Sequence, residues 1–352
     1  MTPTPEIAVV VGAYSRESYL RDAVRSVLAQ TVPRDAIEVL VTKDFERPEL
    51  DAELARDGVR VVRDETSRIG AWLLAAIRET RAPIVTLLDD DDLYAPGRLA
   101  RVLEIFRTHP EVGFYRNRVA MIDPAGEPLP VATWPLRGSD PYFDARGPVR
   151  IEPGSKADLV DLLFRRTRVS FNSSTMAFRR ELLDGRRGEY FAETGLPDSS
   201  LLLNAVVSPW GLFLDDRRLT LHRVHTSNLT RSTGWLRWGV DSSWRFALEA
   251  REFGRADFAE HYERAAIHYD RMLRAAELLD QFGAGGNRWE VVRRAVGYAR
   301  FVARHPGERA WNRDVWGIEA YALAYLLSPS LALRVRRARP AEGSVVSSLP
   351  AG

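Results

Sequence analysis

The chain has 352 residues, enough for one large domain or two modest ones with a sizeable buried core. Apolar residues make up 45% of it, which excludes a disordered chain, and the absence of cysteine excludes disulfides, a thiolate nucleophile and cysteine-ligated metal sites. Fifty Lys and Arg against 48 Asp and Glu leave a net charge of +2, so we do not expect nucleic acid as a partner.

No stretch of the sequence reaches the ~18 apolar residues that a membrane span requires. The N-terminus also lacks the basic region and apolar run of a secretion signal, and the lack of cysteine fits a reducing compartment. We therefore expect a cytoplasmic protein. The basic amphipathic stretch Leu331–Arg339 fits either a solvated helix end or a surface that contacts anionic lipid, so peripheral contact with the cytoplasmic face of a membrane stays open.

The first ninety residues alternate short apolar runs with segments of helical spacing. The apolar runs, which predict buried strands, are Ile7–Val11, Ile37–Thr42, Val59–Val62 and Ala82–Leu88. Helical spacing marks residues 15–30 and 69–80. This alternation predicts an α/β fold with a Rossmann-like, mostly parallel central sheet that is covered by helices on both faces. Such a sheet binds its ligands at the carboxyl ends of its strands.

Further along, the predicted elements are less regular. The expected helices are 95–109, 157–166 and 198–208, and the expected strands are 112–122 and 172–178. We place Pro96 in the first turn of its helix, where the missing N–H is not needed, and a capping box of Ser155 and Asp158 before the second helix. Residues 123–154 hold seven Pro and four Gly, which predicts a long loop or lobe that contacts the acceptor.

Beyond Thr233 the sequence predicts helices only. Apolar residues recur at helical spacing at Phe258, Tyr262, Ala265, Tyr269, Met272 and Ala276. We therefore expect a catalytic domain at 1–232, a helical domain at 233–338 and a disordered tail at 339–352. The helical domain fits an acceptor site, a membrane contact or a subunit interface, and self-association stays open.

The sharpest chemical feature is the run of four carboxylates from Asp89 to Asp92, directly after a strand expected to be buried. Adjacent carboxylates repel one another unless a cation is present, and Mg²⁺ typically binds through one or two of them together with substrate phosphates. By itself the run also fits a solvated strand end that caps the next helix. Its place at the carboxyl end of a strand favours a ligand site.

The order of these motifs resembles the inverting nucleotide-sugar glycosyltransferases of family two, which have the GT-A fold. The resemblance rests on VVVGAYSRESYLRDAVRSVLAQT, IEVLVTKD, an Ile-Gly helix and VTLLDDDDLYAPGRL, and it spans roughly residues 5–230. It implies that Asp89 and Asp91 hold Mn²⁺ or Mg²⁺ and the donor diphosphate, with Asp90 near the ribose. It also implies a GT-A fold for this part of the chain, to which the residue pattern beyond Thr233 adds a C-terminal all-helical region.

The same resemblance implies the nucleotide pocket. The family's P-x-Y-N-R loop stands here as Gly12–Arg16, which places Ala13 and Tyr14 in the nucleobase pocket and Glu17 against the base or ribose. Asp44 matches the carboxylate that accepts the uracil N3 proton, although Lys43 precedes it and the family's Gly is missing.

Four further positions match nucleotide or metal contacts of the family. Arg68 and Gly70 fall where members contact the nucleotide, and LTLHRVHTSNLT resembles the late R-x-H-x-x-N motif. The resemblance therefore implies Arg223 near the diphosphate and His225 at the metal. An arginine offsets charge on a leaving diphosphate, and a neutral imidazole ligates ions such as Mn²⁺.

Inverting transfer requires one general base near the acceptor hydroxyl. The family's base is an Asp at the start of a helix about a hundred residues after the metal motif, and Asp198 occupies that position, preceded by Pro197 where the family has Glu. Glu193 is the reserve candidate. From the residues alone, Asp198 also fits an ordinary helix N-cap.

The resemblance implies a metal-dependent hexosyltransferase-type enzyme. It would move a sugar, with a UDP-sugar favoured as donor, to the hydroxyl of a glycan, a lipid-linked sugar or a small molecule. The alternative is a non-catalytic nucleotide-sugar or glycan-binding module on the same fold. A GC-rich, cysteine-free sequence is typical of a bacterial source, which points to polysaccharide or natural-product glycosylation without separating the two. No G-x-G-x-x-G or phosphate-binding loop occurs, which argues against nicotinamide redox chemistry.

Overall fold

The computed structural model describes residues 4–14, 17–63, 68–130, 147–155, 158–167, 169, 172–225, 233–283 and 288–304. The chain divides into two compact units, residues 1–225 and residues 226–352. We describe each unit by itself. The predicted domain boundary at residue 232 stays a prediction.

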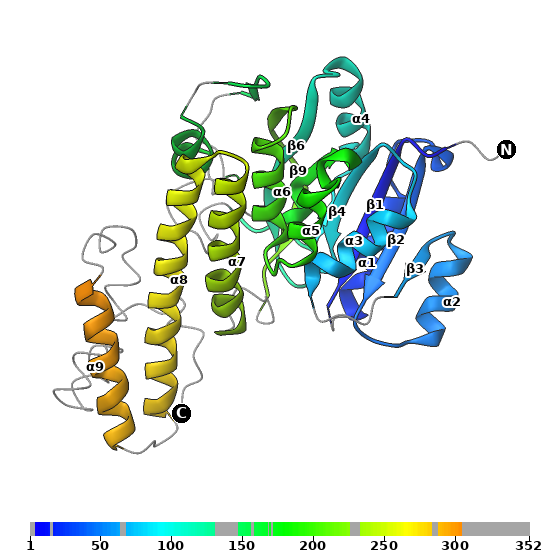
Figure 1. Ribbon diagram of the computed structural model, residues 1–352. Coiled ribbons are helices and arrows are strands. Elements are labelled where there is room, and N and C mark those ends of the chain that lie inside the picture. The colour runs from blue at the N-terminus through cyan, green and yellow to red at the C-terminus, as the bar shows by residue number, and fades with distance from the viewer. Residues whose placement is uncertain are drawn as a thin grey trace. The chain divides into compact units, whose positions relative to one another are not determined.

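The first unit is built on a nine-stranded sheet in the order β3-β2-β1-β4-β8-β6-β9-β5, with β7 paired to β9. Figure 1 shows β3, β2, β1 and β4 in this order along the sheet. Its first four strands are parallel, and they are β1 (Ile7–Ala13), β2 (Ile37–Lys43), β3 (Arg60–Val62) and β4 (Ile84–Asp89). Successive side chains of β1, β2 and β4 point to opposite faces of the sheet. Those on both faces are buried, because helices cover both faces. This arrangement confirms the predicted α/β fold.

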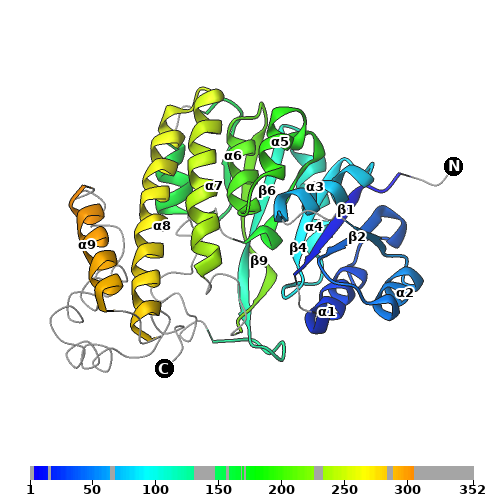
Figure 2. The same cartoon turned by 60° about the horizontal axis from the view of Figure 1, so that its bottom comes forward.

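Helices pack on the two faces of the parallel strands. On one face the core joins the odd residues of β1 to α1 (Glu17–Leu28), α2 (Pro48–Arg56) and α4 (Arg98–Thr108). Figure 2 shows α1 and α2 on one side of these strands and α3 (Ile69–Glu79) on the other. Helix α4 begins at Arg98, after Gly97 with a φ of +82°, so Pro96 precedes the helix and the expectation that it lies in the first turn was wrong.

The second half of the sheet is mixed. Its strands are β8 (Met176–Arg179), β6 (Val112–Ile122), β9 (Gly211–Arg223), β5 (Leu93–Tyr94) and β7 (Val149–Ile151). Strand β8 is antiparallel to both of its neighbours, β4 and β6. Because of this direction, the segment that precedes β8 lies beside the carboxyl end of β4. That edge carries the acidic run.

Four local expectations differ from the structure. Strand β7 lies within the predicted 123–154 loop, because it pairs with β9. Residues 173–175 form a short 3₁₀ turn, so the strand predicted from residue 172 begins only at Met176. The helix predicted at 157–166 contains a π-helical segment, Asp161–Arg166, and Asp158 caps it through the N–H of Asp161. Strand β9 was not predicted.

The remaining elements of the side of the sheet that carries α3 are a short turn at Arg180–Leu183, helix α5 (Arg186–Ala192) and helix α6 (Pro197–Val206). A short turn at Arg34–Ala36 leads into β2. Helix α6 contacts β6 and β9, and it carries Asp198 in its first turn.

The second unit is helical where it is described. It contains α7 (Thr233–Glu252), α8 (Ala256–Gly283) and α9 (Arg288–Arg304). Of the predicted core positions in α8, Phe258, Tyr262, Met272 and Ala276 are buried, and the other two are half-buried. The predicted tail and the basic stretch at 331–339 lie outside the described residues.

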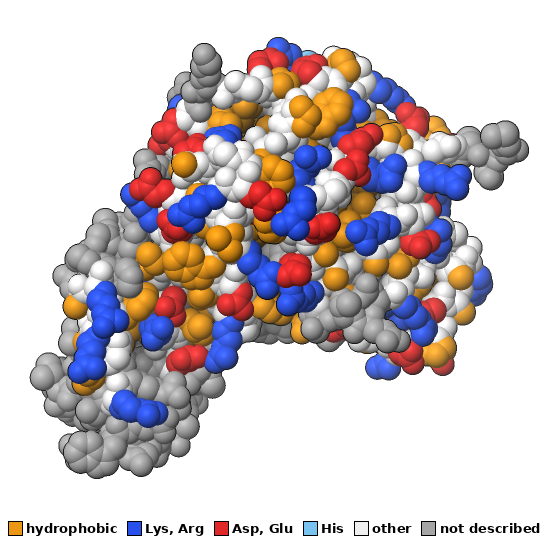
Figure 3. Space-filling view, in the orientation of Figure 1, with side chains coloured by type: hydrophobic (Ala, Val, Ile, Leu, Met, Phe, Trp, Pro, Cys, Tyr) orange, Lys and Arg blue, Asp and Glu red, His pale blue; other side chains and the backbone are white. Residues whose placement is uncertain are grey.

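Two surface properties bear on the sequence expectations. On the face drawn in Figure 3, cationic and anionic side chains are interspersed across the described surface. Among the helices that are described, we find none with the length and apolar character of a membrane span.

Candidate active site

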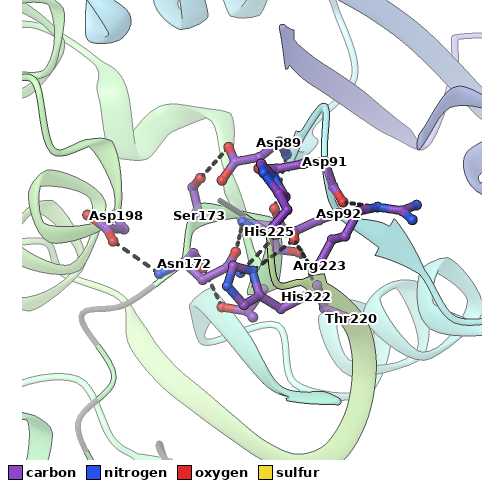
Figure 4. Close-up of polar contacts among 12 residues, drawn as sticks. Asp89, Asp91, Asp92, Asn172, Ser173, Asp198, Thr220, His222, Arg223 and His225 are labelled. Atoms are coloured by element: carbon purple, nitrogen blue, oxygen red, sulfur yellow. Dashed lines mark hydrogen bonds and ion pairs between the residues drawn. The ribbon is translucent and has the colours of Figure 1, made fainter. Parts of the chain in front are cut away.

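The acidic run lies at the carboxyl edge of the sheet, as its position in the sequence predicts. Carboxylate oxygens of Asp89, Asp91 and Asp92 all lie within 4.8 Å of one another (Figure 4). Three carboxylates at this spacing repel one another strongly, and a hard divalent cation with oxygen ligands removes that repulsion.

Asp92 is the anchored member of the cluster. Its carboxylate is buried and accepts hydrogen bonds from Asn172 Nδ2 at 2.8 Å, from His222 Nδ1 at 2.9 Å and from the N–H of Arg223 at 3.1 Å. Burial opposes ionisation, yet the charge of His222 and the hydrogen bonds hold the pKa of Asp92 below its usual value. Because these donors hold its oxygens, Asp92 fixes the shape of the loop formed by residues 89–92.

Asp89 and Asp91 are the other two members of the cluster. Asp89 Oδ1 accepts a hydrogen bond from the hydroxyl of Ser173 at 2.9 Å, and its backbone N–H donates to the hydroxyl of Ser174 at 3.0 Å. Asp91 Oδ2 lies 3.0 Å from Nε2 of His225. The oxygens of the three clustered carboxylates form a donor set that fits a divalent ion such as Mn²⁺ or Mg²⁺, and the imidazole of His225 lies beside one of them, Asp91.

Arg223 lies beneath the loop, in contact with its backbone. Its side chain is buried, Nε donates to the backbone carbonyl of Asp91 at 3.0 Å, and an Nη atom donates to the carbonyl of Pro124 at 2.8 Å. The guanidinium also covers the ring of Tyr19 at 4.6 Å. In this arrangement Arg223 supports the loop, and its predicted contact with the diphosphate stays a prediction.

The end of β1, where the resemblance predicts the nucleobase pocket, is tied to the acidic run through Asp90. The Asp90 carboxylate is buried and accepts the N–H of Tyr14 at 3.1 Å, while its own N–H donates to the carbonyl of Gly12 at 3.0 Å. The ring of Tyr14 stacks on Trp72 of α3, with centroids 5.9 Å apart. Ala13 is buried beside them. The end of β1 therefore presents an aromatic surface next to the carboxylates.

The end of β2 carries the exposed Asp44, whose N–H donates to the carbonyl of Ala13 at 3.3 Å. The preceding Lys43 is buried, and its ammonium lies 3.1 Å from Asp51 and donates to the carbonyl of Phe45. Lys43 is thus engaged with the protein interior. Only Asp44 of this pair faces solvent.

The other predicted nucleotide contacts are spread around this edge. Glu17 forms an ion pair with Arg47 at 2.8 Å. Arg68 is exposed just before α3 and pairs with Glu193 at 2.9 Å. Glu193, the reserve candidate for the base, is itself exposed. Their predicted roles stay predictions.

Gly70 is required by packing. A Cβ atom at this position would lie 1.9 Å from the carbonyl oxygen of Phe191, and the N–H of Gly70 donates to the carbonyl of Thr194 at 3.1 Å. We expect Gly70→Ala to lower the free energy of unfolding by about 3 kcal/mol, because backbone must move. Gly297→Ala is the control, since that site in α9 has open space, and chemical denaturation measures both. Equal stability of the two variants would contradict the close packing.

Asp198 lies at the start of α6, apart from the carboxylate cluster but joined to it through one residue. Its carboxylate accepts the N–H of Ser199 at 2.7 Å and the N–H of Asn172 at 3.1 Å. Burial raises the pKa of Asp198 to about 6, against these hydrogen bonds and the nearby charge of Arg116. A carboxyl group with this pKa is mostly ionised at neutral pH and is a suitable proton acceptor.

Sequence reasoning missed the polar residues that hold the cluster. Asn172, Ser173 and Ser174 come from the turn before β8, and His222 comes from the end of β9. The available signal was the polar run Asn-Ser-Ser-Thr before an apolar strand, together with a second histidine three residues before His225.

The sequence was also compared with known proteins. The sequence profile of glycosyl transferase family 2 matches residues 8–183, half of the chain. An uncharacterized glycosyltransferase of Nostoc sp. is 29% identical over 114 residues, which are 31% of this chain and 35% of that relative. The chain thus matches about a third of the length of this curated relative.

Two solved structures share the fold. Staphylococcus aureus TarS 1–349 in complex with UDP superposes with a TM-score of 0.55 at 15% identity, over 95% of this chain and 92% of that one. The mannosyltransferase PcManGT of Pyrobaculum calidifontis, in complex with GDP-Man and Mn²⁺, gives 0.53 at 18% identity, over 93% and 87%. The sheet with its acidic strand end has the GT-A fold, and the chain belongs to glycosyl transferase family 2.

Proposed function

We propose that this protein is a metal-dependent inverting glycosyltransferase that moves a sugar from a nucleoside diphosphate to an acceptor hydroxyl. The observation that carries the proposal is the pairing of two sites at one sheet edge. A cluster of three carboxylates lies there within 4.8 Å, and a separate carboxylate with a pKa of about 6 is linked to it through Asn172.

The carboxylates of Asp89 and Asp91, together with His225, would hold Mn²⁺ or Mg²⁺. When bound, the ion neutralises charge on the leaving diphosphate. The protein residues around the cluster keep its shape, because Ser173, Asp92 and Arg223 hold the loop by hydrogen bonds. Asp90 would lie near the ribose.

Asp198 would act as the general base. It would take the proton of the acceptor hydroxyl while that oxygen bonds to C1 of the sugar and the bond from C1 to the diphosphate oxygen breaks. Attack from the face opposite the leaving group inverts the configuration at C1. Glu193 fits this role less well, because it is exposed and paired with Arg68.

For the donor we favour a UDP-sugar. Tyr14, stacked on Trp72, offers a surface for a base, and the exposed Asp44 offers an acceptor for the N3 proton of uracil. Ala13, Glu17, Arg68 and Gly70 belong to the same proposed pocket. The acceptor would be a glycan, a lipid-linked sugar or a small molecule with a free hydroxyl.

Calorimetric titration with UDP, GDP, CDP and dTDP, each with Mn²⁺, with Mg²⁺ and with EDTA, tests this proposal. We expect tight binding of one diphosphate, UDP, only when a divalent ion is present. Absence of metal-dependent binding to all four would refute the proposal as stated. Binding without sugar transfer to any acceptor would instead favour a nucleotide-sugar-binding module.

A further inference from the structure

A single residue, Asn172, lies between the carboxylate cluster and Asp198. Figure 4 shows it with Asp198 on one side and with Asp92 and His222 on the other. Its backbone N–H donates to Asp198 Oδ2 at 3.1 Å, and its side-chain Nδ2 donates to Asp92 Oδ2 at 2.8 Å. The same residue thus binds the proposed base with its main chain and the metal loop with its side chain.

The other polar groups of Asn172 are engaged as well. Its Oδ1 accepts the N–H of Ser174 at 2.8 Å, and its backbone carbonyl accepts the N–H of Thr175 at 3.1 Å. The residue is 6% exposed. These contacts fix both its side chain and the peptide group whose N–H reaches Asp198.

The backbone of Asn172 is in an unusual conformation. Its φ is +67°, and no other non-glycine residue in the described part of the chain has a positive φ. Residues with a Cβ rarely adopt this region, although Asn tolerates it better than most. Glycine would fit the backbone without supplying the amide, and Asp would supply a charge that repels Asp92. Asn tolerates the positive φ and also supplies an uncharged amide that donates to Asp92.

We propose that Asn172 is a positioning residue that sets the place of the Asp198 carboxylate relative to the metal-binding loop. The side-chain amide holds residue 172 against Asp92, and the backbone N–H then holds one oxygen of Asp198, while the N–H of Ser199 holds the other. This inference rests on the proposed function, because it assigns Asp198 the role of base.

The turn supplies a matched control. Ser173, the next residue, also connects this turn to the acidic run, since its hydroxyl donates to Asp89 Oδ1 at 2.9 Å. The bond to Asp198, by contrast, is made by the backbone of Asn172. A change at the Ser173 side chain therefore removes a contact with the metal loop and leaves the link to Asp198 in place.

The first test is a carboxyl NMR titration of the metal-free full chain with ¹³C-labelled aspartate, in which Asp198→Asn identifies the resonance. Because the N–H of Asn172 lowers the pKa of Asp198, we expect Asn172→Gly to move the midpoint upward and Ser173→Ala to leave it at the wild-type value. An unchanged midpoint in Asn172→Gly, or an equal shift in both variants, would overturn the inference. Circular dichroism confirms that each variant is folded.

The second test measures release of the nucleoside diphosphate from the donor, with water as the acceptor. With UDP-sugar and Mn²⁺ at saturating concentrations, we expect Asn172→Gly to lower kcat about 10- to 100-fold, because a displaced base reacts poorly. An unchanged kcat would overturn the inference. If the wild-type protein releases no diphosphate, the proposed function fails, while the NMR titration still decides whether Asn172 positions Asp198.

Discussion

Replacement of Asp198 with Asn should slow sugar transfer about 10²- to 10⁴-fold while UDP and metal still bind, because the change removes a proton acceptor and preserves the shape of the side chain. In the wild type, turnover should fall about tenfold per pH unit below pH 6, where the carboxyl group is protonated. The turnover of Asp198→Asn should not show this fall below pH 6. Steady-state rates between pH 5 and 8 measure both effects.

Stability gives an independent check on the same residue. The pKa of Asp198 is about 6 in the folded protein, above the ordinary value of 3.8, so folding favours the protonated form. The stability that protonation supplies is lost as the pH rises through 6. We therefore subtract the melting temperature of the wild type from that of Asp198→Asn. This difference should be larger at pH 7.5 than at pH 5, because only the wild type loses stability as the carboxyl group ionises.

Glu193→Gln is the matched control for the base, because Glu193 is exposed and paired with Arg68. We expect its turnover to stay within a few-fold of the wild type. If Glu193→Gln lost activity and Asp198→Asn did not, the assignment of the base would be reversed.

Asp91→Ala should weaken metal-dependent binding of UDP by more than about 100-fold. Loss of an outer partner of a metal ligand already costs 10- to 100-fold in affinity, and Asp91 is proposed to bind the ion directly. The fold should persist, because the loop is held through Asp92 and through the backbone carbonyl that Arg223 contacts. Titration calorimetry with and without EDTA measures the loss.

Thermal unfolding separates this effect from misfolding. An ion that binds only the folded protein raises its stability by about 2.7 kcal/mol at a hundred times its Kd. Mn²⁺ should therefore raise the melting temperature of the wild type and leave that of Asp91→Ala unchanged. Asp92→Asn should behave differently, because the loss of its charge beside His222 should lower stability even without metal. A full response to Mn²⁺ in Asp91→Ala would contradict the proposed ligand set.

The parallel half of the sheet was predictable because its signal is local. Buried runs such as Ile7–Val11 and Ile37–Thr42 are apolar throughout, and they mark strands wherever they lie in the sheet. The position of Asp89 at a carboxyl end follows from the strand that precedes it. The hydrogen-bond partners of Asp89, one to its carboxylate and one to its backbone N–H, do not follow, because they come from residues more than eighty positions away.

The turn at residues 172–175 illustrates what the sequence could not supply. Its contact with the acidic run depends on β8 being antiparallel and lying between β4 and β6. Hydrophobic periodicity carries no information about strand order. The positive φ of Asn172 was equally hidden, because the residue bonds with Asp92 and Asp198, which lie far from it in the sequence.

The insertion of β8 between two earlier strands also affects how the chain folds during synthesis. Strand β4 ends at Asp89 and β6 ends at Ile122, but β8, which joins them, is complete only at Arg179. While the intervening residues leave the ribosome, the native partner of one apolar edge of β4 does not yet exist. Unpaired strand edges promote aggregation, so the nascent chain should depend on chaperones until β8 has emerged.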